Sequence, residues 1–142
     1  MKDRLPMLLV LAVFVGGVAV IGSKFIDGEV QASANVEVKV PELSDTAKLG
    51  EKTFTAVCAQ CHGSNASGSD KGPPLVHDTY NPGHHADGAF YMAVKRGVKA
   101  HHWPFGHMPP QKGVSEKQVA EIIQYVRELQ QANGIRYRKH TM

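Results

Sequence analysis

Two stretches of the chain carry apolar residues at helical spacing. The first runs from about Asp45 to Cys58 and the second from Glu116 to about Ala132, each with apolar positions at steps of three and four. Ser44 and Ser115 stand where N-caps are expected, and Gln118 would close a capping box with Ser115. The pattern predicts two amphipathic helices, with apolar faces formed by Leu43, Ala47, Gly50, Phe54 and Val57 in the first and by Val119, Ile122, Ile123, Val126 and Leu129 in the second.

A third, shorter helix is predicted from about Ala86 to Gly97, with Phe90, Tyr91, Met92 and Val94 as its apolar content. Residues 63–85 and 97–114 are rich in glycine and proline and read as loops. Loops of this length are uncommon in a compact domain unless they surround something that is not protein. We therefore expect a mainly α domain over residues 45–134 with a cofactor at its centre.

The N-terminal part of the chain has a different pattern. An uncharged, apolar run from Leu5 to Gly22 reaches roughly 27 Å as a helix, close to the hydrocarbon thickness of a bilayer. It is longer than the usual apolar region of a signal peptide, although Ala32-Ser33-Ala34 would suit a cleavage site. We expect residues 5–22 to form a transmembrane anchor rather than a cleaved leader.

The charges around this run predict its orientation. Residues 1–4 carry Lys2 and Arg4 and are expected to stay cytoplasmic, which places the rest of the chain in the periplasm. Residues 23–44 are polar and small-residue-rich and predict a flexible tether, in which Val36, Val38 and Val40 could form one short strand. Residues 135–142 read as a basic C-terminal tail. The expected location is the inner (cytoplasmic) membrane, with one pass.

Amino-acid composition and net charge exclude few classes of function. The 142 residues are 42% hydrophobic and 20% charged, and the formal net charge is +3. So small a charge gives no case for nucleic-acid binding.

Both cysteines of the chain lie in one short stretch, CAQCH, which ends on His62. A thioredoxin-type redox pair would need a strand before the motif, and a structural zinc site usually needs a second cysteine pair. A structural disulfide between Cys58 and Cys61 is a further alternative. Cys-x-x-Cys-His is the attachment signature of c-type haem, in which Cys58 and Cys61 form thioether bonds and His62 is the first axial ligand of the iron.

Residues 46–131 resemble a class I cytochrome c domain. The resemblance is carried by Gly50 and Phe54 before the motif, Gly72-Pro73-Pro74-Leu75 after it, Met108-Pro109 preceded by Gly106, and Tyr125 on the inner face of the closing helix. It implies one covalent haem c. It also implies that a carbonyl of the loop at residues 72–75, taken to be that of Pro73, accepts a hydrogen bond from His62.

Met108 is the expected sixth ligand of the iron, because the family places its axial methionine in such a Met-Pro. The rigid, proline-rich loop around it suits a ligand that must hold a soft thioether at the metal. Met92 is expected to pack in the core. The alternatives are Met108 as a gap-filler and a histidine such as His107 as the ligand. Histidine–methionine ligation raises the reduction potential and suits an electron carrier.

Six histidines lie in the two loops: His77, His84, His85, His101, His102 and His107. They could be ordinary hydrogen-bonding residues, or one from each adjacent pair could bind copper or zinc. Trp103 and Phe105 are expected to cover the porphyrin or its propionate edge.

Together these patterns predict a membrane-anchored, mono-haem cytochrome that relays single electrons and has no small-molecule substrate. We do not expect an enzyme, because a six-coordinate iron leaves no open position. The expected partners are redox proteins such as a quinol-oxidising complex, a terminal oxidase or a dehydrogenase. The alternatives are a haem-based sensor and a histidine-rich protein that handles copper.

Overall fold

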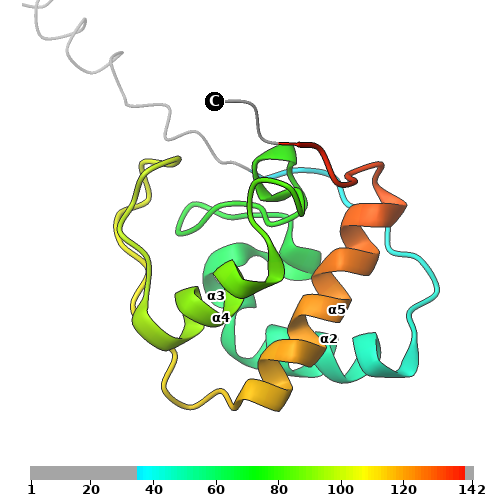
Figure 1. Ribbon diagram of the computed structural model, residues 1–142, viewed down its shortest axis with the longest axis horizontal. Coiled ribbons are helices and arrows are strands. Elements are labelled where there is room, and N and C mark those ends of the chain that lie inside the picture. The colour runs from blue at the N-terminus through cyan, green and yellow to red at the C-terminus, as the bar shows by residue number, and fades with distance from the viewer. Residues whose placement is uncertain (1–34, 140–142) are drawn as a thin grey trace, which may run out of the picture. The chain divides into compact units, whose positions relative to one another are not determined.

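The computed structural model describes residues 35–139, and this part of the chain is mainly helical. The only β-type pairing in these residues is a single antiparallel bridge between Val98 and Met108. The elements in order are α2 (Asp45–Val57), α3 (Ala59–His62), the 3-10 turns η1 (Ser64–Ala66) and η2 (Asp78–Tyr80), α4 (Asp87–Arg96) and α5 (Glu116–Ala132) (Figure 1).

The two long helices begin at the predicted caps. The Ser44 side chain accepts a hydrogen bond from Ala47 N at the start of α2. Ser115 and Gln118 form the reciprocal capping box at the start of α5. At the other end of α5, Gly134 adopts a positive φ of 80°, a conformation that glycine allows at little steric cost. The sequence prediction for both helices is confirmed.

The core lies where α2 crosses α5, which Figure 1 shows side by side. Gly50 makes this crossing close, because a Cβ at that position would collide with the backbone carbonyl of Glu121 in α5. Phe54 and Tyr125 face each other with ring centroids 5.6 Å apart, and both side chains are almost fully buried. The predicted face of α5 is buried throughout, at Val119, Ile122, Ile123, Val126 and Leu129.

Helix α4 differs from the long helices α2 and α5 because none of its residues is buried. The prediction that Met92 packs in the core is wrong: this side chain is 45% exposed. The apolar residues of α4 are not spaced in a single inward stripe, and several of them line a cavity instead of the α2–α5 core.

The segments that flank the helices are bound to the domain. The sequence predicts a tether over residues 23–44, yet residues 35–44 are extended along the domain without forming a strand. Lys39 N donates to the side-chain oxygen of Asn133, and Asn133 Nδ2 donates back to Lys39 O, both at 2.8 Å. Leu43 is part of the core. These contacts join residues far apart in sequence, which is why local composition suggested a leash.

The predicted tail also starts later than residue 135. Ile135 is only 9% exposed and belongs to the core. Arg138 N donates to Asn81 Oδ1 at 3.3 Å, and its guanidinium contacts Asp78 at 3.1 Å. The domain therefore continues at least to residue 138.

The predicted anchor, residues 5–22, lies outside the described residues, as does the rest of the tether. Within residues 35–139, none of the helices has the length and apolar character needed to cross a membrane.

Candidate functional site

The Cys-x-x-Cys-His motif lies at the junction of two helices. Cys58 ends α2, and its carbonyl accepts hydrogen bonds from Cys61 N and His62 N at 3.1 and 2.9 Å. This tight turn, which contains the short helix α3, brings the motif's side chains together. Both cysteines are partly buried, and Cys58 and His62 line a common cavity.

The environment of Cys58 does not suit a reactive thiolate. Burial raises the pKa of Cys58 to about 11, and the neighbouring Cys61 adds to this rise. Redox-active cysteines have lowered pKa values, because the thiolate is the reacting species. The Cys58 thiol is therefore poorly suited to disulfide exchange.

His62 is oriented by its hydrogen bond to the next loop. Its Nδ1 lies 2.8 Å from the carbonyl oxygen of Pro73, which is the contact that the family resemblance implies. Burial lowers the pKa of His62, and the bond to Pro73 opposes this only in part. The imidazole is therefore neutral at pH 7. With Nδ1–H donated to Pro73, the lone pair of Nε2 is available to a metal.

The cavity beside this motif has a volume of about 500 Å³, which lies within the range typical of ligand sites. Its lining is mainly apolar and comes from α2, α4, α5 and both long loops. The principal apolar side chains are Phe54, Leu75, Phe90, Met92, Val98, Trp103, Phe105 and Ile122. The loops thus enclose a large apolar space, as their length predicts.

Met108 lines the same cavity as His62. The bridge with Val98 fixes its backbone through two hydrogen bonds of 2.9 and 3.0 Å. Gly97 precedes this bridge with φ +76°, and a Cβ there would collide with Met108 O. His107 is exposed and does not line the cavity; its Nδ1 accepts a hydrogen bond from Ala100 N. Of the candidates Met108 and His107, only Met108 contacts the cavity.

One buried polar group in the cavity wall has no partner. Trp103 Nε1 is buried and makes no hydrogen bond. Burial raises the pKa of Tyr80 to about 12, and the nearby Trp103 indole opposes part of that rise. Buried N–H groups are normally satisfied, so this one suits an acceptor within the cavity. The carboxylates of a haem would supply one.

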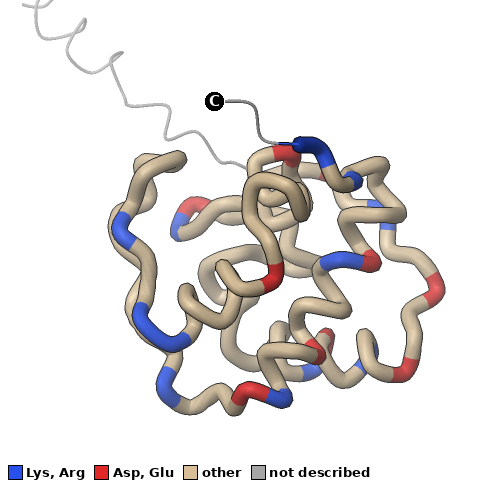
Figure 2. The backbone as a smooth tube through the Cα atoms, in the orientation of Figure 1, with Lys and Arg blue, Asp and Glu red and all other residues tan. Residues whose placement is uncertain are grey.

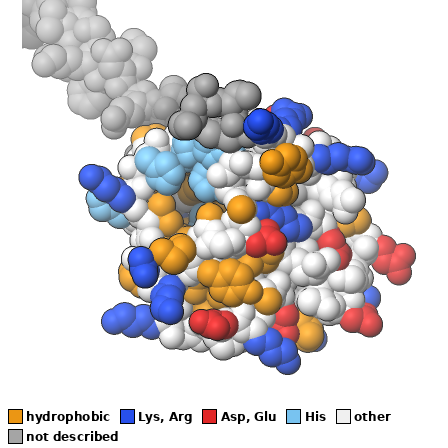
Figure 3. Space-filling view, viewed as in Figure 1, with side chains coloured by type: hydrophobic (Ala, Val, Ile, Leu, Met, Phe, Trp, Pro, Cys, Tyr) orange, Lys and Arg blue, Asp and Glu red, His pale blue; other side chains and the backbone are white. Residues whose placement is uncertain are grey.

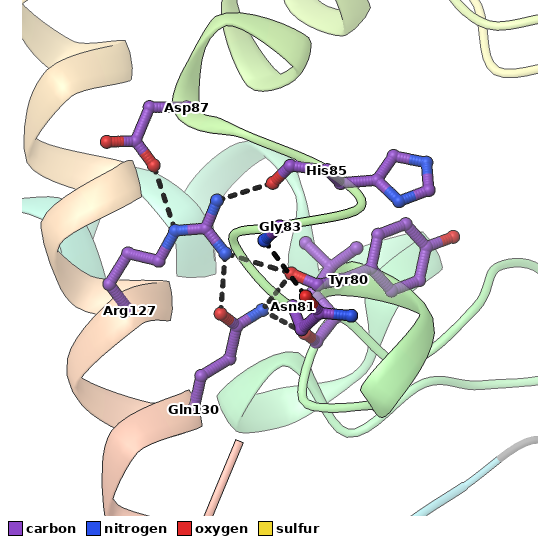
Figure 4. Close-up of polar contacts among 8 residues, drawn as sticks. Tyr80, Asn81, Gly83, His85, Asp87, Arg127 and Gln130 are labelled. Atoms are coloured by element: carbon purple, nitrogen blue, oxygen red, sulfur yellow. Dashed lines mark hydrogen bonds and ion pairs between the residues drawn. The ribbon is translucent and has the colours of Figure 1, made fainter. Parts of the chain in front are cut away.

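A polar network joins α5 to the loop between residues 75 and 87 (Figure 4). The Arg127 guanidinium donates to the carbonyls of Tyr80 and His85 at 2.9 and 2.6 Å, and to Asp87 at 2.9 Å. Gln130 is 1% exposed, and its Nε2 donates to the carbonyls of Leu75 and Tyr80. These two α5 side chains hold an otherwise irregular segment against the helix.

Sequence reasoning missed Arg127 and Gln130. The available signal was their position: both lie three or four residues from apolar members of the inner face of α5, where a polar residue needs a partner. Asn81 holds the loop through contacts both near and far in sequence. Asn81 receives hydrogen bonds from Gly83 N and Arg138 N and donates to Asp78 O.

The structure brings three of the six loop histidines together. The ligand nitrogens of His84, His85 and His102 lie within 4.8 Å of one another. The His101 ring lies tilted against that of His102 with centroids 4.2 Å apart, whereas His77 packs edge-on against Trp103 and caps η2.

A comparison with protein families agrees with this geometry. A family model described as "Cytochrome c" matches residues 47–130. A crystal structure of cytochrome CL from the marine methylotrophic bacterium Methylophaga aminisulfidivorans is 29% identical, with a TM-score of 0.48; the match covers 59% of this chain and 53% of that one. This chain thus spans about half of that protein's length. The search of curated proteins gives no match.

The family match covers more than half of the chain and includes the Cys-x-x-Cys-His motif, the Pro73 loop and Met108. Members of this family carry a covalently bound haem c with its iron, and typically act as electron carriers. The cavity fits that group: it offers the thiol of Cys58, a neutral imidazole, a thioether and an unpaired N–H within apolar walls, and Cys61 lies three positions after Cys58 in the same turn. The chain belongs to the cytochrome c family.

Proposed function

We propose that the protein is a membrane-anchored, mono-haem cytochrome that relays single electrons and does no chemistry on a substrate. Cys58 and Cys61 would hold the haem, and His62 and Met108 would be the axial ligands. One observation carries this proposal: His62 and Met108, which come from opposite ends of the fold's loop region, line one apolar cavity that also contains Cys58.

When bound, the haem supplies a one-electron iron couple. The chain's own residues orient the iron ligands and influence the reduction potential of that couple. Pro73 O orients the His62 ring and leaves Nε2 as the nitrogen available to the iron. The Val98–Met108 bridge holds the thioether in a fixed loop. Apolar walls exclude water from the site and, with the methionine ligand, favour a higher reduction potential.

The surface beside the Met108 loop suits an acidic redox partner. Residues 88–115 contain no acidic residue: Lys95 and Arg96 lie in the last turn of α4, and Lys99 and Lys112 lie in the segment that follows it. Figure 2 shows positive charges along this part of the chain. Such a field speeds diffusional encounter with a negatively charged surface. We propose a quinol-oxidising complex, a terminal oxidase or a dehydrogenase as partner.

Membrane attachment is supported by the sequence of residues 5–22, with the haem domain in the periplasm. Because residues 35–44 are bound to the domain, only residues 23–34 remain to connect it to the anchor. A freely shuttling carrier and a fixed subunit differ in one observable. A stoichiometric partner that co-purifies in mild detergent identifies a subunit, and its absence indicates a shuttle.

The ligand set is tested by comparing Met108→Ala with Met92→Ala in the exported, haem-loaded full chain. Both methionines line the cavity, so the two variants remove the same atoms from the same space. We expect Met108→Ala to lose the sulfur-to-iron charge-transfer absorption and to bind carbon monoxide when reduced, whereas Met92→Ala does neither. Carbon monoxide binding by the reduced wild-type protein would contradict a carrier and indicate a haem-based sensor.

A further inference from the structure

Three histidines from two separate loops converge at the rim of the cavity. His84 and His85 follow η2, and His102 lies in the loop after α4. Figure 3 shows histidine side chains gathered on this face of the molecule. We propose that His84, His85 and His102 form a second metal site, which binds a divalent ion of the Zn²⁺ or Cu²⁺ type and is separate from the haem iron.

The distances suit coordination by one ion. His84 Nε2 and His102 Nε2 lie 3.2 Å apart. Two nitrogens bound to one tetrahedral zinc at about 2.0–2.1 Å are separated by about 3.3–3.4 Å. The third nitrogen, on His85, lies within 4.8 Å of both, so a side-chain adjustment completes the set.

The tautomer of His85 suits metal binding. Its Nδ1 lies 2.7 Å from the carbonyl oxygen of Thr79, which requires the proton to be on Nδ1. The lone pair is then on Nε2, the nitrogen that can reach the other two rings. Metal-bound histidines commonly donate their second nitrogen to a carbonyl or carboxylate in this way, because the bond fixes the ring and raises its basicity.

The backbone that carries two of these ligands is held in place. His84 N and His85 N both donate to Asn81 O, at 3.0 and 2.9 Å. The carbonyl of His85 accepts from Arg127 Nη2 at 2.6 Å. The ring centroid of His102 lies 5.1 Å from that of His84 and 5.2 Å from that of His85, so the three imidazoles are neighbours.

The ligand type determines the class of ion. The group consists of three imidazoles and contains no carboxylate. Imidazole suits zinc, copper and nickel, whereas magnesium and calcium require oxygen ligands. Among the first-row divalent ions, Cu²⁺ should bind most tightly. A bound ion would connect the loop of residues 77–85 to the loop of residues 97–108 at the rim of the haem cavity.

The test uses the full-length, haem-loaded protein without a polyhistidine tag. Equilibrium dialysis against Zn²⁺, Cu²⁺ or Mg²⁺ is followed by elemental analysis of metal per haem iron. We expect one Zn²⁺ or Cu²⁺ per chain and no retained Mg²⁺. In the variant His84→Gln/His102→Gln the affinity should fall by at least about 100-fold, since loss of even an outer partner of a metal ligand costs about 10–100-fold.

The matched control is His107→Asn. It also removes one exposed imidazole from this loop, but Asn keeps an acceptor for Ala100 N and the residue lies outside the group. Its affinity should equal that of the wild type. The visible spectrum of the haem, unchanged in all three proteins, reports an intact domain and separates this test from that of the axial ligands.

If the double variant loses its haem spectrum, the test uses the single variant His102→Gln instead. His102 is exposed on its loop, so this substitution should not disturb the fold. Its affinity should fall by at least about tenfold. Equal affinity in wild type and histidine variants, or no retained Zn²⁺ and Cu²⁺ in the wild type, would overturn the proposal.

Discussion

The two halves of the domain are stabilised in different ways. Where α2 crosses α5, apolar side chains fill the space: Phe54, Tyr125, Val126 and Leu129 are each at most 1% exposed. The half that contains α4 and the two long loops has no buried residue in its helix, and encloses a cavity of about 500 Å³. One half is packed by its own side chains, and the other surrounds a space.

The two halves therefore depend on different interactions for their stability. Close packing of the α2–α5 pair needs only the chain, because interlocking side chains supply their own contacts. The loop half relies on long-range polar contacts from Arg127 and Gln130 and on the haem expected in its cavity. Substitutions in the loop half should therefore affect the haem site first, and those at the helix ends should affect stability alone.

The largest effect is expected when the covalent attachment is removed. Cys58→Ala/Cys61→Ala should leave no haem attached to the chain after denaturation, because no thiol remains to form a thioether. Haem-dependent staining on a denaturing gel measures this. The control is Gln60→Ala, between the two cysteines, whose exposed side chain makes one long hydrogen bond of 3.5 Å. Residual covalent haem in the double variant would contradict the assignment.

The next largest effect is expected from the polar network. Gln130→Ala leaves Leu75 O without its side-chain donor and Arg127 without one acceptor, in a buried setting. The free energy of unfolding should fall by about 2–4 kcal/mol, since each buried group left unpaired costs about 1–3 kcal/mol. Denaturant titration of the haem-loaded protein measures it.

Gln124→Ala is the matched control for Gln130→Ala. It removes the same side chain from the same helix, but Gln124 is exposed and bonds only to Glu128. A change within about 0.5 kcal/mol is expected there. Equal losses in the two variants would show that the network does not hold the loop half.

A smaller loss of stability, with a clear spectral effect, is expected at Gly97. Gly97→Ala places a Cβ against Met108 O at a positive φ, so the loop must shift. The free energy of unfolding should fall by about 1–3 kcal/mol, and the sulfur-to-iron absorption should weaken. The control Gly88→Ala in α4 meets nothing within 4 Å and should be neutral or slightly stabilising. An unchanged spectrum in Gly97→Ala would contradict the role of Met108.

The smallest effect is expected at the contact between Ser44, which caps the start of α2, and Glu128 of α5. Burial raises the pKa of Glu128, but hydrogen bonds from Ser44 and Gln124 outweigh it, so the pKa lies below its ordinary value of 4.5. A lowered pKa contributes stability above pH 4.5 that is lost as the pH falls through the lower, folded-state value. Glu128→Gln should therefore destabilise by at most about 1 kcal/mol at pH 7, with no difference from wild type in strong acid. A difference that grows as the pH falls would contradict this contact.

Sequence patterns predicted the features that are local. The α2–α5 pair follows from apolar residues at fixed helical steps, and its caps from Ser44 and Ser115. The attachment motif is contiguous in sequence, so Cys58, Cys61 and His62 needed no structure to be found. Met108 was predicted through the family resemblance, and the structure adds that it lines the same cavity as His62.

What could not be predicted depends on contacts between distant residues without periodic pattern. His84 and His102 meet across 18 positions through two loops, so nothing local shows that they converge. The docking of residues 35–44 depends on Asn133, 94 positions from Lys39. The prediction for Met92 was wrong because an apolar residue in a helix can face either the packed core or a cofactor cavity. The spacing of apolar residues does not distinguish these two environments.

The central claim is that this domain folds around a haem bonded to Cys58 and Cys61. The most direct test is the intact mass of the exported full chain, measured under denaturing conditions together with its reduced-minus-oxidised visible spectrum. We expect the mass of the polypeptide plus one haem, with the spectrum of a low-spin, thioether-linked haem. A colourless protein with the mass of the polypeptide alone, whether its two thiols are free or joined to each other, would contradict the account.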